Sequence, residues 1–183
     1  CSAMRVNFVG ELGWELHHPI EYQNHIFDQL MKAGKEFGLK PYGIRAMNSL
    51  RVEKSYKLVG TELSIEYSPY ESGLDRFIHP NKGDFIGRAA LDKWRAKGFS
   101  NKLVTMEIHG VTDADVLGNN PIYDNGSVVG RATSGDFGFR LNKSIALGMV
   151  KPELAKVGQK LKIDILGKMH EASIVEDSPY DTD

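Results

Sequence analysis

The sequence lacks the features that mark several large classes of protein. It contains one cysteine in 183 residues, which excludes an intramolecular disulfide and a multi-cysteine metal site. Its 23 lysines and arginines almost balance its 24 acidic residues, and a net charge of −1 provides no electrostatic attraction to nucleic acid or to an anionic membrane. No apolar run is long enough to span a bilayer, and the first residues form no apolar signal segment. We therefore expect neither nucleic acid nor a membrane as a partner.

Two common kinds of cofactor site are missing as well. No Gly-x-Gly-x-x-Gly follows an expected strand, so the chain encodes no dinucleotide site. The six histidines have no metal-like spacing, and the neighbouring His17 and His18 would point to opposite faces of a strand. We therefore predict no metal site and assign no catalytic residue to this chain. The single cysteine permits a reducing compartment, and we expect the cytoplasm or the mitochondrial matrix.

What is present is an ordinary globular composition, 41% hydrophobic and 26% charged, at a length that suits one large domain or two small ones. Residues 5–17 alternate apolar and polar side chains around two glycines, which predicts a hairpin with a tight turn. Helical periodicity predicts helices over 21–37 and 43–56. Glycine, serine and proline then predict a loop over 57–72, and residues 72–78 resemble a short strand entering the interior.

The apolar side chains of the expected helices indicate which faces turn inward. The first helix is expected to end at Gly38, a residue that favours the left-handed conformation after a helix. Residues 85–97 predict an amphipathic connecting helix between two units. We expect a common stripe on the 43–56 helix to include Ile44, Met47 and Leu50. We expect the connector to bury Phe85, Ile86 and Trp94.

The second half of the chain, residues 101–176, has the pattern of strands throughout. Period-2 alternation and apolar runs predict several short strands separated by glycine turns, which is typical of a small antiparallel barrel or sandwich. Asn125-Gly126 lies between two apolar arms and predicts a type I′ hairpin turn, because both central residues of that turn need positive φ. We expect the acidic tail after Glu176 to be disordered.

One carboxylate, Glu11, is singled out by its place in the hairpin. It lies at the expected turn between Gly10 and Gly13, close to backbone that carries no side chain. An ionised carboxylate held there can accept two parallel N–H donors from a planar ligand, as it does from a guanidinium. The alternative is a solvated glutamate at a hairpin tip, since exposed glutamates are the rule.

The sequence around Glu11 resembles a family signature. Gly-Glu-Leu-Gly-Trp-Glu-Leu at residues 10–16 is similar to the Gly-Glu-x-Gly-(aromatic)-Glu signature of the aminomethyltransferase (glycine-cleavage T-protein) family, which includes the folate-binding C-terminal region of dimethylglycine and sarcosine dehydrogenases. Ala-Met-Asn-Ser-Leu-Arg-Val-Glu-Lys at residues 46–54 resembles the helix that lines the family's folate cleft, in the form of the dimethylglycine dehydrogenase branch. In the glycine-cleavage branch, an Arg-Asp pair stands where Met47 and Asn48 stand here.

Further matches follow in the order of the family. Residues 82–91 resemble its Phe-Ile-Gly connector, and residues 130–135 resemble the Gly-x-x-Thr-Ser-Gly turn of its C-terminal barrel. Residues 144–150 and 158–161 are similar to the next strands of that barrel. The resemblance therefore covers about residues 5–175.

The resemblance implies an α+β fold, the C-terminal part of the T-protein fold, in which an α+β folate-cleft segment precedes a small, jelly-roll-like antiparallel β-barrel. We expect residues 1–83 to form a partial folate-binding aminomethyltransferase domain, 84–98 a connecting helix and 99–183 the C-terminal barrel domain. The family's acid/base aspartate lies well upstream of the Glu11 signature, and so does the FAD domain of its dehydrogenase branch. We therefore expect the chain to be a C-terminal portion of a longer enzyme and to be inactive alone.

The resemblance also implies a function for that parent protein. It would transfer a one-carbon unit from a methylated amine to tetrahydrofolate and form 5,10-methylenetetrahydrofolate. Its partners would be folate, the methylated amine and the upstream domains, with FAD only in an upstream domain. Glu11 would accept hydrogen bonds from the pterin ring N–H and amino group, and Tyr56 would contact the folate. Arg51 would make either a folate contact or a buried ion pair. The remaining candidate folate ligands lie near the barrel rim: Arg131, Thr133 and Ser134.

Three other interpretations stay open. The parent could be a glycine-cleavage aminomethyltransferase with a lipoyl carrier, a folate-dependent demethylase, or a non-catalytic folate-binding or docking module. The sequence upstream of Cys1 would distinguish them. A Rossmann glycine fingerprint there indicates a flavin dehydrogenase, and an aspartate-bearing folate half without a flavin domain indicates the T-protein or the demethylase. If neither is present, a binding module is favoured.

Overall fold

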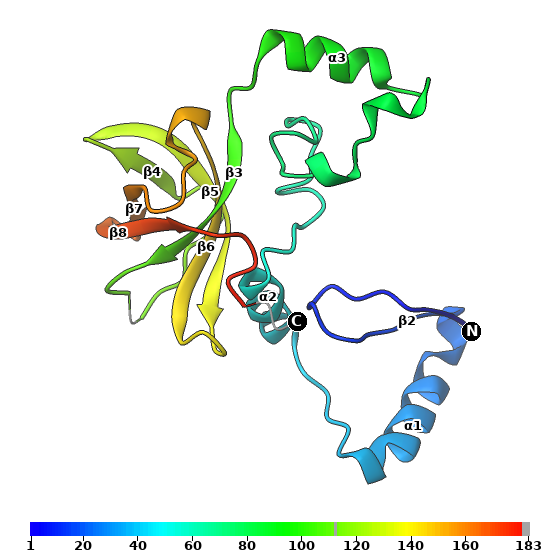
Figure 1. The fold of residues 1–183 in the computed structure, drawn as a ribbon. Coiled ribbons are helices and arrows are strands. Elements are labelled where there is room, and N and C mark those ends of the chain that lie inside the picture. Colours follow the sequence, from blue (N-terminus) through cyan, green and yellow to red (C-terminus); the bar gives the residue numbers. More distant parts are fainter. Residues whose placement is uncertain (112, 181–183) are drawn as a thin grey trace.

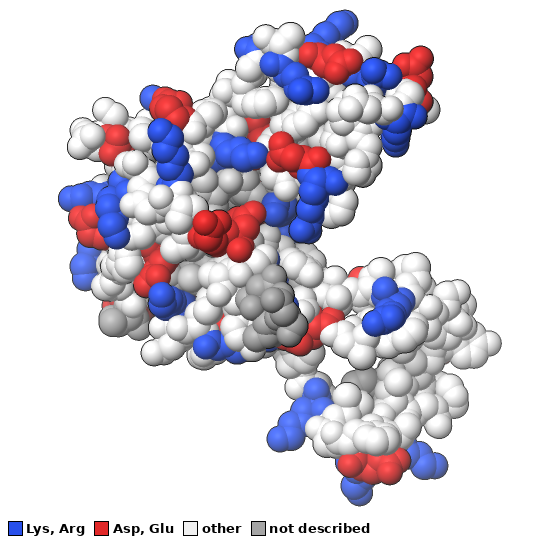
Figure 2. All heavy atoms as spheres, viewed as in Figure 1, with Lys and Arg blue, Asp and Glu red and all other residues white. Residues whose placement is uncertain are grey.

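The structure is a closed β-barrel from which two arms project (Figure 1). This computed structural model describes residues 1–111 and 113–180. One arm carries helix α1 (Gln23–Gly34) and the other carries helix α3 (Arg88–Lys97), while helix α2 (Ile44–Glu53) lies against the barrel between them. The two arms and the barrel border a broad hollow on the face seen in Figure 2. The α+β fold class that the resemblance implies is therefore confirmed.

Antiparallel strands close the barrel in the order β3-β6-β5-β4-β7-β8. The last strand pairs with the first, as in Met106↔Ile174, so the sheet closes without leaving either of them as an edge. The predicted small antiparallel barrel is thus confirmed as a barrel rather than a sandwich. Its strands are β3 (Lys102–Ile108), β4 (Pro121–Asp124), β5 (Ser127–Gly138), β6 (Lys143–Val150), β7 (Lys160–Ile165) and β8 (Lys168–Val175).

The barrel interior holds the main hydrophobic core. Alternation along β7 decides which of its side chains enter that core, because successive residues of a strand point to opposite faces. Leu161, Ile163 and Ile165 are buried, whereas Lys160 and Lys162 are exposed. Burying each large aliphatic side chain contributes about 1.5–3 kcal/mol to stability.

A second, smaller cluster lies on the outside of the barrel. It consists of Leu103, Leu147 and Met149, and Tyr67 packs against it. Tyr67 belongs to the 57–72 segment, where the only described bridge is Val59↔Leu63 and no helix or strand forms. The predicted loop is therefore confirmed, and it crosses the outer face of the barrel.

The Asn125-Gly126 turn has the predicted geometry. Asn125 has φ of 47° and Gly126 has φ of 80°, and the flanking residues pair as Asp124↔Ser127. Positive φ at both central residues is what the type I′ turn requires. The prediction is confirmed.

The glycines of residues 130–135 do not form the expected turn. They lie within β5, whose pairing with β6 shifts register between Ala132 and Ser134. A Cβ on Gly130 would lie 2.2 Å from the Met149 carbonyl oxygen, so this glycine permits close approach of β6. The prediction of a turn was wrong because a bulged strand and a turn both favour glycine.

The N-terminal hairpin has shorter strands and a longer loop than predicted. Strand β1 (Ser2–Met4) pairs with β2 (Glu15–His17), so residues 5–14 form the connecting loop. Two short 3₁₀ helices, η1 (Ile20–Tyr22) and η2 (Lys35–Phe37), flank α1. Gly38 ends this helical run with φ of 70°, as predicted.

The arm formed by residues 1–43 exposes its apolar side chains. No residue of α1 is buried, and the lobe that contains α1 and the hairpin is largely uncharged in Figure 2. Many large apolar side chains exposed on one arm normally mark a contact with another polypeptide or a ligand. The large apolar residues that are exposed there include Leu12, Trp14, Ile20, Tyr22, Phe27, Leu30, Phe37, Leu39 and Tyr42.

The segment that joins the loop to the barrel departs from the prediction in two respects. The 3₁₀ helix η3 (Asp75–Phe77) stands where a short strand was expected, and a second one, η4 (Pro80–Lys82), follows. Helix α3 projects away from the barrel and has no buried residue (Figure 1). The predicted inward face was therefore wrong: Ile86 is fully exposed, and Phe85 and Trp94 are only half-buried.

The C-terminal tail is ordered as far as it is described. Ser178 N–H donates to Ser55 Oγ at 2.9 Å, and Tyr180 N–H donates to the Glu53 carbonyl at 3.0 Å. The prediction of disorder after Glu176 was therefore wrong for residues 177–180, because backbone N–H groups of this segment bind Ser55 and the last residue of α2, Glu53. Residues 181–183 lie outside the described residues. Within the described part of the chain, no helix has the length and apolarity needed to cross a membrane.

The core predicts how substitutions in the barrel affect stability. Met106 is fully buried in the core, whereas Met169 on β8 is 46% exposed. Met106→Ala should lower the free energy of unfolding by about 2–5 kcal/mol, because it removes apolar contacts and leaves a cavity. Met169→Ala is the matched control and should change it by about 0.5 kcal/mol or less. Urea unfolding followed by circular dichroism measures both, and equal losses would contradict the assignment of the core.

Candidate functional site

Helix α2 meets the barrel through a largely polar face. The predicted inward stripe was wrong at its first position, since Ile44 is 76% exposed. The residues of α2 that are buried are instead Ser49, Arg51, Val52 and Glu53. Buried polar groups are costly unless they are hydrogen-bonded, so the partners of these side chains determine how the helix sits.

Two residues in the middle of α2 bind strand β5. Ser49 Oγ donates to the Phe137 carbonyl at 2.6 Å. Asn48 Nδ2 donates to the Gly135 carbonyl at 3.1 Å and to Asp136 Oδ2 at 2.7 Å. Because these bonds use backbone carbonyls at defined positions, they fix the register of the helix along the strand.

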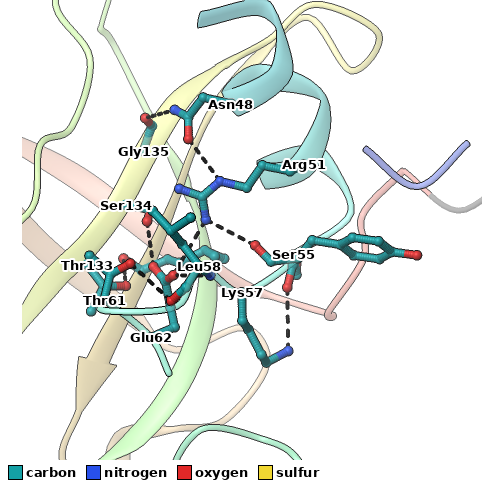
Figure 3. Close-up of polar contacts among 12 residues, drawn as sticks. Asn48, Arg51, Ser55, Lys57, Leu58, Thr61, Glu62, Thr133, Ser134 and Gly135 are labelled. Carbon is teal, nitrogen blue, oxygen red and sulfur yellow. Dashed lines mark hydrogen bonds and ion pairs between the residues drawn. The ribbon is translucent and has the colours of Figure 1, made fainter. Parts of the chain in front are cut away.

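Arg51 lies where α2, the 57–72 loop and β5 meet (Figure 3). Its side chain is 2% exposed, and Nη1 lies 3.6 Å from Glu62 Oε2. Nε donates to Asn48 Oδ1 at 2.8 Å, and Nη1 donates to the Tyr56 carbonyl at 3.0 Å. Burial lowers the pKa of the guanidinium, and the charges of Glu62 and Asp136 oppose that shift. Arg51 still stays charged, because an arginine pKa lies so far above neutrality.

Glu62 is the partner of Arg51 and is fully buried. Ser134 Oγ donates to Oε1 at 2.5 Å, and the Leu58 N–H donates to Oε2 at 2.8 Å. Burial by itself would raise the pKa of the carboxyl. Hydrogen bonds from Ser134, Thr133 and Leu58, together with the charge of Arg51, outweigh burial and hold that pKa below its usual range. The pair is therefore ionised and locks the loop against the barrel.

A hollow of about 390 Å³ opens beside this cluster, between α2 and the barrel. Asn48, Arg51 and Asp136 contribute polar atoms to its wall, and an exposed ion pair borders it, with Arg45 Nη2 3.0 Å from Asp115 Oδ2. The apolar part of the lining comes from Phe8, Ile44, Met47, Leu58 and Leu117.

The C-terminal end of α2 carries a second buried carboxylate, Glu53. Arg140, in the turn between β5 and β6, donates to it twice: the backbone N–H at 2.7 Å to Oε1 and Nε at 2.8 Å to Oε2. The Nη1 atom of the same guanidinium contacts Glu11 Oε1, so Arg140 joins the hairpin loop to α2. These hydrogen bonds raise the pKa of the Arg140 guanidinium although burial opposes them.

A second hollow, of about 470 Å³, lies at the C-terminal end of α2 and contains Tyr56. Lys54, Lys57 and Arg76 also line it. The hairpin loop reaches the same place, because a Cβ built on Gly10 would lie 2.0 Å from Lys54 Cδ. The structure therefore brings the loop that carries Glu11 to the edge of the hollow that contains Tyr56.

Arg131 has a different environment at the barrel rim. Its Nη2 atom lies 2.6 Å from both Glu66 Oε2 and the Tyr67 hydroxyl, and Nη1 donates to Asn119 Oδ1 at 2.7 Å. The hydrogen bond with the Tyr67 hydroxyl is the main cause that raises the pKa of Arg131; burial opposes it, and Glu66 adds to the rise. Its guanidinium fastens the 57–72 loop to the barrel.

The candidate residues thus fall into three places. Arg51, Thr133 and Ser134 meet around Glu62, and Arg131 fastens the 57–72 loop to β5. Tyr56 lines the hollow at the end of α2, and Glu11 lies on the hairpin loop that packs on Lys54 at its edge. Sequence reasoning missed two buried acids beside Arg51, Glu62 and Asp136, and the arginine that pairs with Glu11, Arg140. Local pattern carried no signal for them, because Ser134 and Glu62 are 72 residues apart and Arg140 and Glu11 are 129 apart. In the described parts of the chain, no cluster of three His, Cys, Asp or Glu is arranged to hold a metal ion.

Comparison with known families identifies the class of protein. The family model described as the GCVT N-terminal domain matches residues 1–82, and the model described as the glycine cleavage T-protein C-terminal barrel domain matches residues 101–181. The chain belongs to the aminomethyltransferase (glycine-cleavage T-protein) family and matches its C-terminal region.

Individual relatives come from two branches. The chain is 40% identical over 177 residues to human mitochondrial dimethylglycine dehydrogenase, covering 96% of this chain and 20% of that protein. It is 35% identical over 175 residues to an aminomethyltransferase of Desulfitobacterium hafniense, covering 96% of this chain and 47% of the relative. The crystal structure of aminomethyltransferase T of the Bartonella henselae glycine cleavage system superposes with a TM-score of 0.84 at 24% identity, covering 96% of this chain and 48% of that one. The chain therefore spans about half the length of these aminomethyltransferases and a fifth of the dehydrogenase.

The buried ion pair predicts an acid-sensitive fold. Because the folded-state pKa of Glu62 is depressed, its contribution to stability is complete above the ordinary pKa of about 4.5 and is lost as pH falls through the depressed value. Glu62→Gln should lower the free energy of unfolding at pH 7 by about 3–5 kcal/mol, since it leaves Arg51 buried and uncompensated. The loss should shrink as the pH falls below about 4.5.

Urea titrations of the unmodified chain and of Glu62→Gln, at several pH values between 7 and 3, measure how the free energy of unfolding depends on pH. Glu66→Gln is the control, because the Glu66 side chain is 64% exposed in its ion pair with Arg131. A Glu62→Gln protein that loses stability with acid as steeply as the unmodified chain would show that Glu62 is not the titrating group.

Proposed function

We propose that this chain is the folate-binding C-terminal part of a one-carbon transfer enzyme of the dimethylglycine dehydrogenase type. Such an enzyme forms 5,10-methylenetetrahydrofolate from a methylated amine. The observation that carries the proposal is the 40% identity with human mitochondrial dimethylglycine dehydrogenase over 96% of the chain. In this proposal the longer protein holds FAD in an upstream domain and works in the mitochondrial matrix.

The environment of Glu11 fits the pterin end of the folate. An ionised carboxylate accepts only, and its two oxygens provide about four lone-pair sites. Arg140 contacts Oε1, which leaves acceptor capacity for the ring N–H and the amino group of a pterin. The side chain is 53% exposed at the tip of the loop, so a planar ligand can reach it.

The hollow that contains Tyr56 fits the rest of the molecule. Its volume of about 470 Å³ lies in the range of about 300–1,000 Å³ that is typical of small-molecule sites. Tyr56 and Phe77 supply aromatic surface, and the cations Lys57 and Arg76 suit the carboxylates at the glutamate end of folate. We therefore propose Glu11 and Tyr56 as the residues that contact folate.

The other candidates are proposed as supports. Arg51, Thr133 and Ser134 are buried around Glu62, where they hold the wall on which the ligand rests. Arg131 fastens the loop that covers the barrel. Tetrahydrofolate, when bound, supplies the nitrogens that capture the one-carbon unit, and this chain binds and orients it. No residue of this chain is assigned a proton-transfer role.

The exposed apolar arm is consistent with an upstream part of the same enzyme. We propose that the upstream half of the folate domain covers α1 and the hairpin, and so completes the cleft. The aminomethyltransferase relatives are about twice as long as the region that this chain matches, which leaves room for such a half. This chain alone should therefore bind tetrahydrofolate weakly or not at all and should have no activity.

A glycine-cleavage aminomethyltransferase is the second candidate. It is favoured by the 35% identity with an aminomethyltransferase over 96% of the chain. Against it, Met47 and Asn48 occupy the positions where the glycine-cleavage branch carries Arg-Asp. Flavin absorbance in the purified longer protein would favour the dehydrogenase, and dependence on a lipoyl carrier would favour this alternative.

Replacing Glu11 tests the folate site. In the longer protein, Glu11→Gln should weaken binding of tetrahydrofolate at least about tenfold, because the amide presents a donor to the donors of the pterin. Flavin-linked oxidation of the amine, measured with an artificial electron acceptor, should continue. Calorimetric titration with tetrahydrofolate provides the affinity.

Glu15→Gln is the matched control, since Glu15 lies in the same hairpin and is 52% exposed. Its affinity for folate should equal that of the unmodified protein. If Glu11→Gln binds folate equally well, Glu11 is only a loop residue and the central assignment fails.

A further inference from the structure

We propose that Arg140 is the positioning residue that orients the Glu11 carboxylate toward the ligand. The inference rests on the proposed function in one respect, namely that Glu11 contacts folate. Arg140 lies in the β5–β6 turn of the barrel, and its guanidinium reaches two carboxylates that come from different parts of the chain. It would act through Glu11 and would not touch the ligand.

The Arg140 guanidinium is held by the buried Glu53 independently of its contact with Glu11. Glu53 is fully buried and accepts from both the backbone N–H and the Nε atom of Arg140, at 2.7 and 2.8 Å. Gly138 allows this approach, because a Cβ there would lie 2.9 Å from Glu53 Cγ. A planar guanidinium held at Nε and at its own backbone has little freedom left to rotate.

The C-terminal tail packs an aromatic ring against the Arg140 guanidinium. The Tyr180 ring lies 4.2 Å from the central carbon of the guanidinium, in a cation–π arrangement. Tyr180 is itself held by its N–H, which donates to the Glu53 carbonyl at 3.0 Å. The Nη2 atom is shielded from solvent and has no hydrogen-bond partner among the described residues. Nη1 therefore remains as the donor that reaches the hairpin.

The loop around Glu11 needs such a fixed point. Residues 5–14 contain no helix or strand, and most of them are exposed. This loop meets the rest of the molecule through the packing of Gly10 on Lys54 and through the ion pair of Glu11 with Arg140. The first places the backbone and the second directs the carboxylate.

An ordinary surface ion pair would not have this effect, because two mobile side chains lose as much freedom as the contact gains. Here Arg140 is already immobile, so only the Glu11 side chain loses much conformational freedom when the pair forms. The side chain of Arg140 is 25% exposed, which also reduces screening by solvent. The pair can therefore hold the Glu11 carboxylate in one orientation.

A double-mutant cycle in the longer protein tests the inference. Arg140→Lys keeps a positive charge beside Glu53, but an ammonium group cannot reach both carboxylates as the fork of arginine does. Affinity for 5-formyltetrahydrofolate, a stable reduced folate, should fall about fivefold or more in this variant and about tenfold or more in Glu11→Gln. The double variant should bind no more weakly than Glu11→Gln alone. Fully additive losses would overturn the inference, and so would an unchanged affinity in Arg140→Lys when Glu11→Gln does weaken binding.

Hydrogen exchange separates this inference from the proposed function. In the present chain without ligand, Arg140→Lys and Glu11→Gln should each speed exchange of the amides of residues 5–14, and the double variant should show no further increase. Unchanged exchange in Arg140→Lys overturns the inference. If Glu11→Gln leaves folate affinity unchanged while exchange rises in both variants, the positioning of Glu11 is supported and the folate assignment alone fails. Arg88→Lys on α3 is the control and should change neither measurement.

Tyr180→Leu provides a second variant if Arg140→Lys does not fold. It removes the ring beside the guanidinium but leaves the contacts of Arg140 with Glu53 and Glu11 in place. Exchange in residues 5–14 should rise in this variant, by less than in Glu11→Gln. Exchange at the rate of the unmodified chain would count against a fixed guanidinium.

Discussion

The polar seam between helix α2 and the barrel is the constraint on which the rest of the structure depends. Apolar faces can slide past one another, whereas the seam is made of hydrogen bonds to particular carbonyls and of buried ion pairs. A buried charge that loses its partner is strongly destabilising, so α2 can occupy only one position on the barrel. The main core of the barrel is built from residues 104–174 and contains no residue of α2. By contrast, the loop over the barrel, the hairpin loop and the C-terminal tail are connected to this helix through Glu62, Arg140 and Tyr180.

The barrel was predictable from the sequence because its rules are local. Alternation along residues 160–165 and the Asn125-Gly126 dipeptide each determine structure within a few residues. The helices were also predicted, since their periodicity is local, but the faces that they bury were not predicted. Ile44 was expected on the inward stripe and is exposed. Arg51, expected to make either a folate contact or a buried ion pair, is buried and pairs with Glu62. A helical wheel assumes that water lies on the polar side, and here the polar side faces β5.

The candidate site was predictable only in part, for the same physical reason. A carboxylate between two glycines, Glu11, could be singled out from its neighbours along the chain. Its partner could not, because Arg140 lies 129 residues away, in the turn between β5 and β6. Glu62 lay in a stretch that was correctly predicted as a loop, and a loop pattern says nothing about which of its acids is buried. The residues that hold a site are set by tertiary contacts, and a single sequence does not display these.

The exposed arm and the polar seam would have different roles in the proposed folate site. Hydrophobic burial is non-directional, so covering the apolar surface of α1 and the hairpin can bring another part of the enzyme close without orienting any one group. Orientation needs directional bonds, and those are supplied from the barrel side through Arg140. An apolar partner would therefore add binding energy and exclude water, while the barrel fixes the angle of the carboxylate. In this proposal the barrel is more than a support, because it would set the geometry of Glu11, the residue proposed to contact folate.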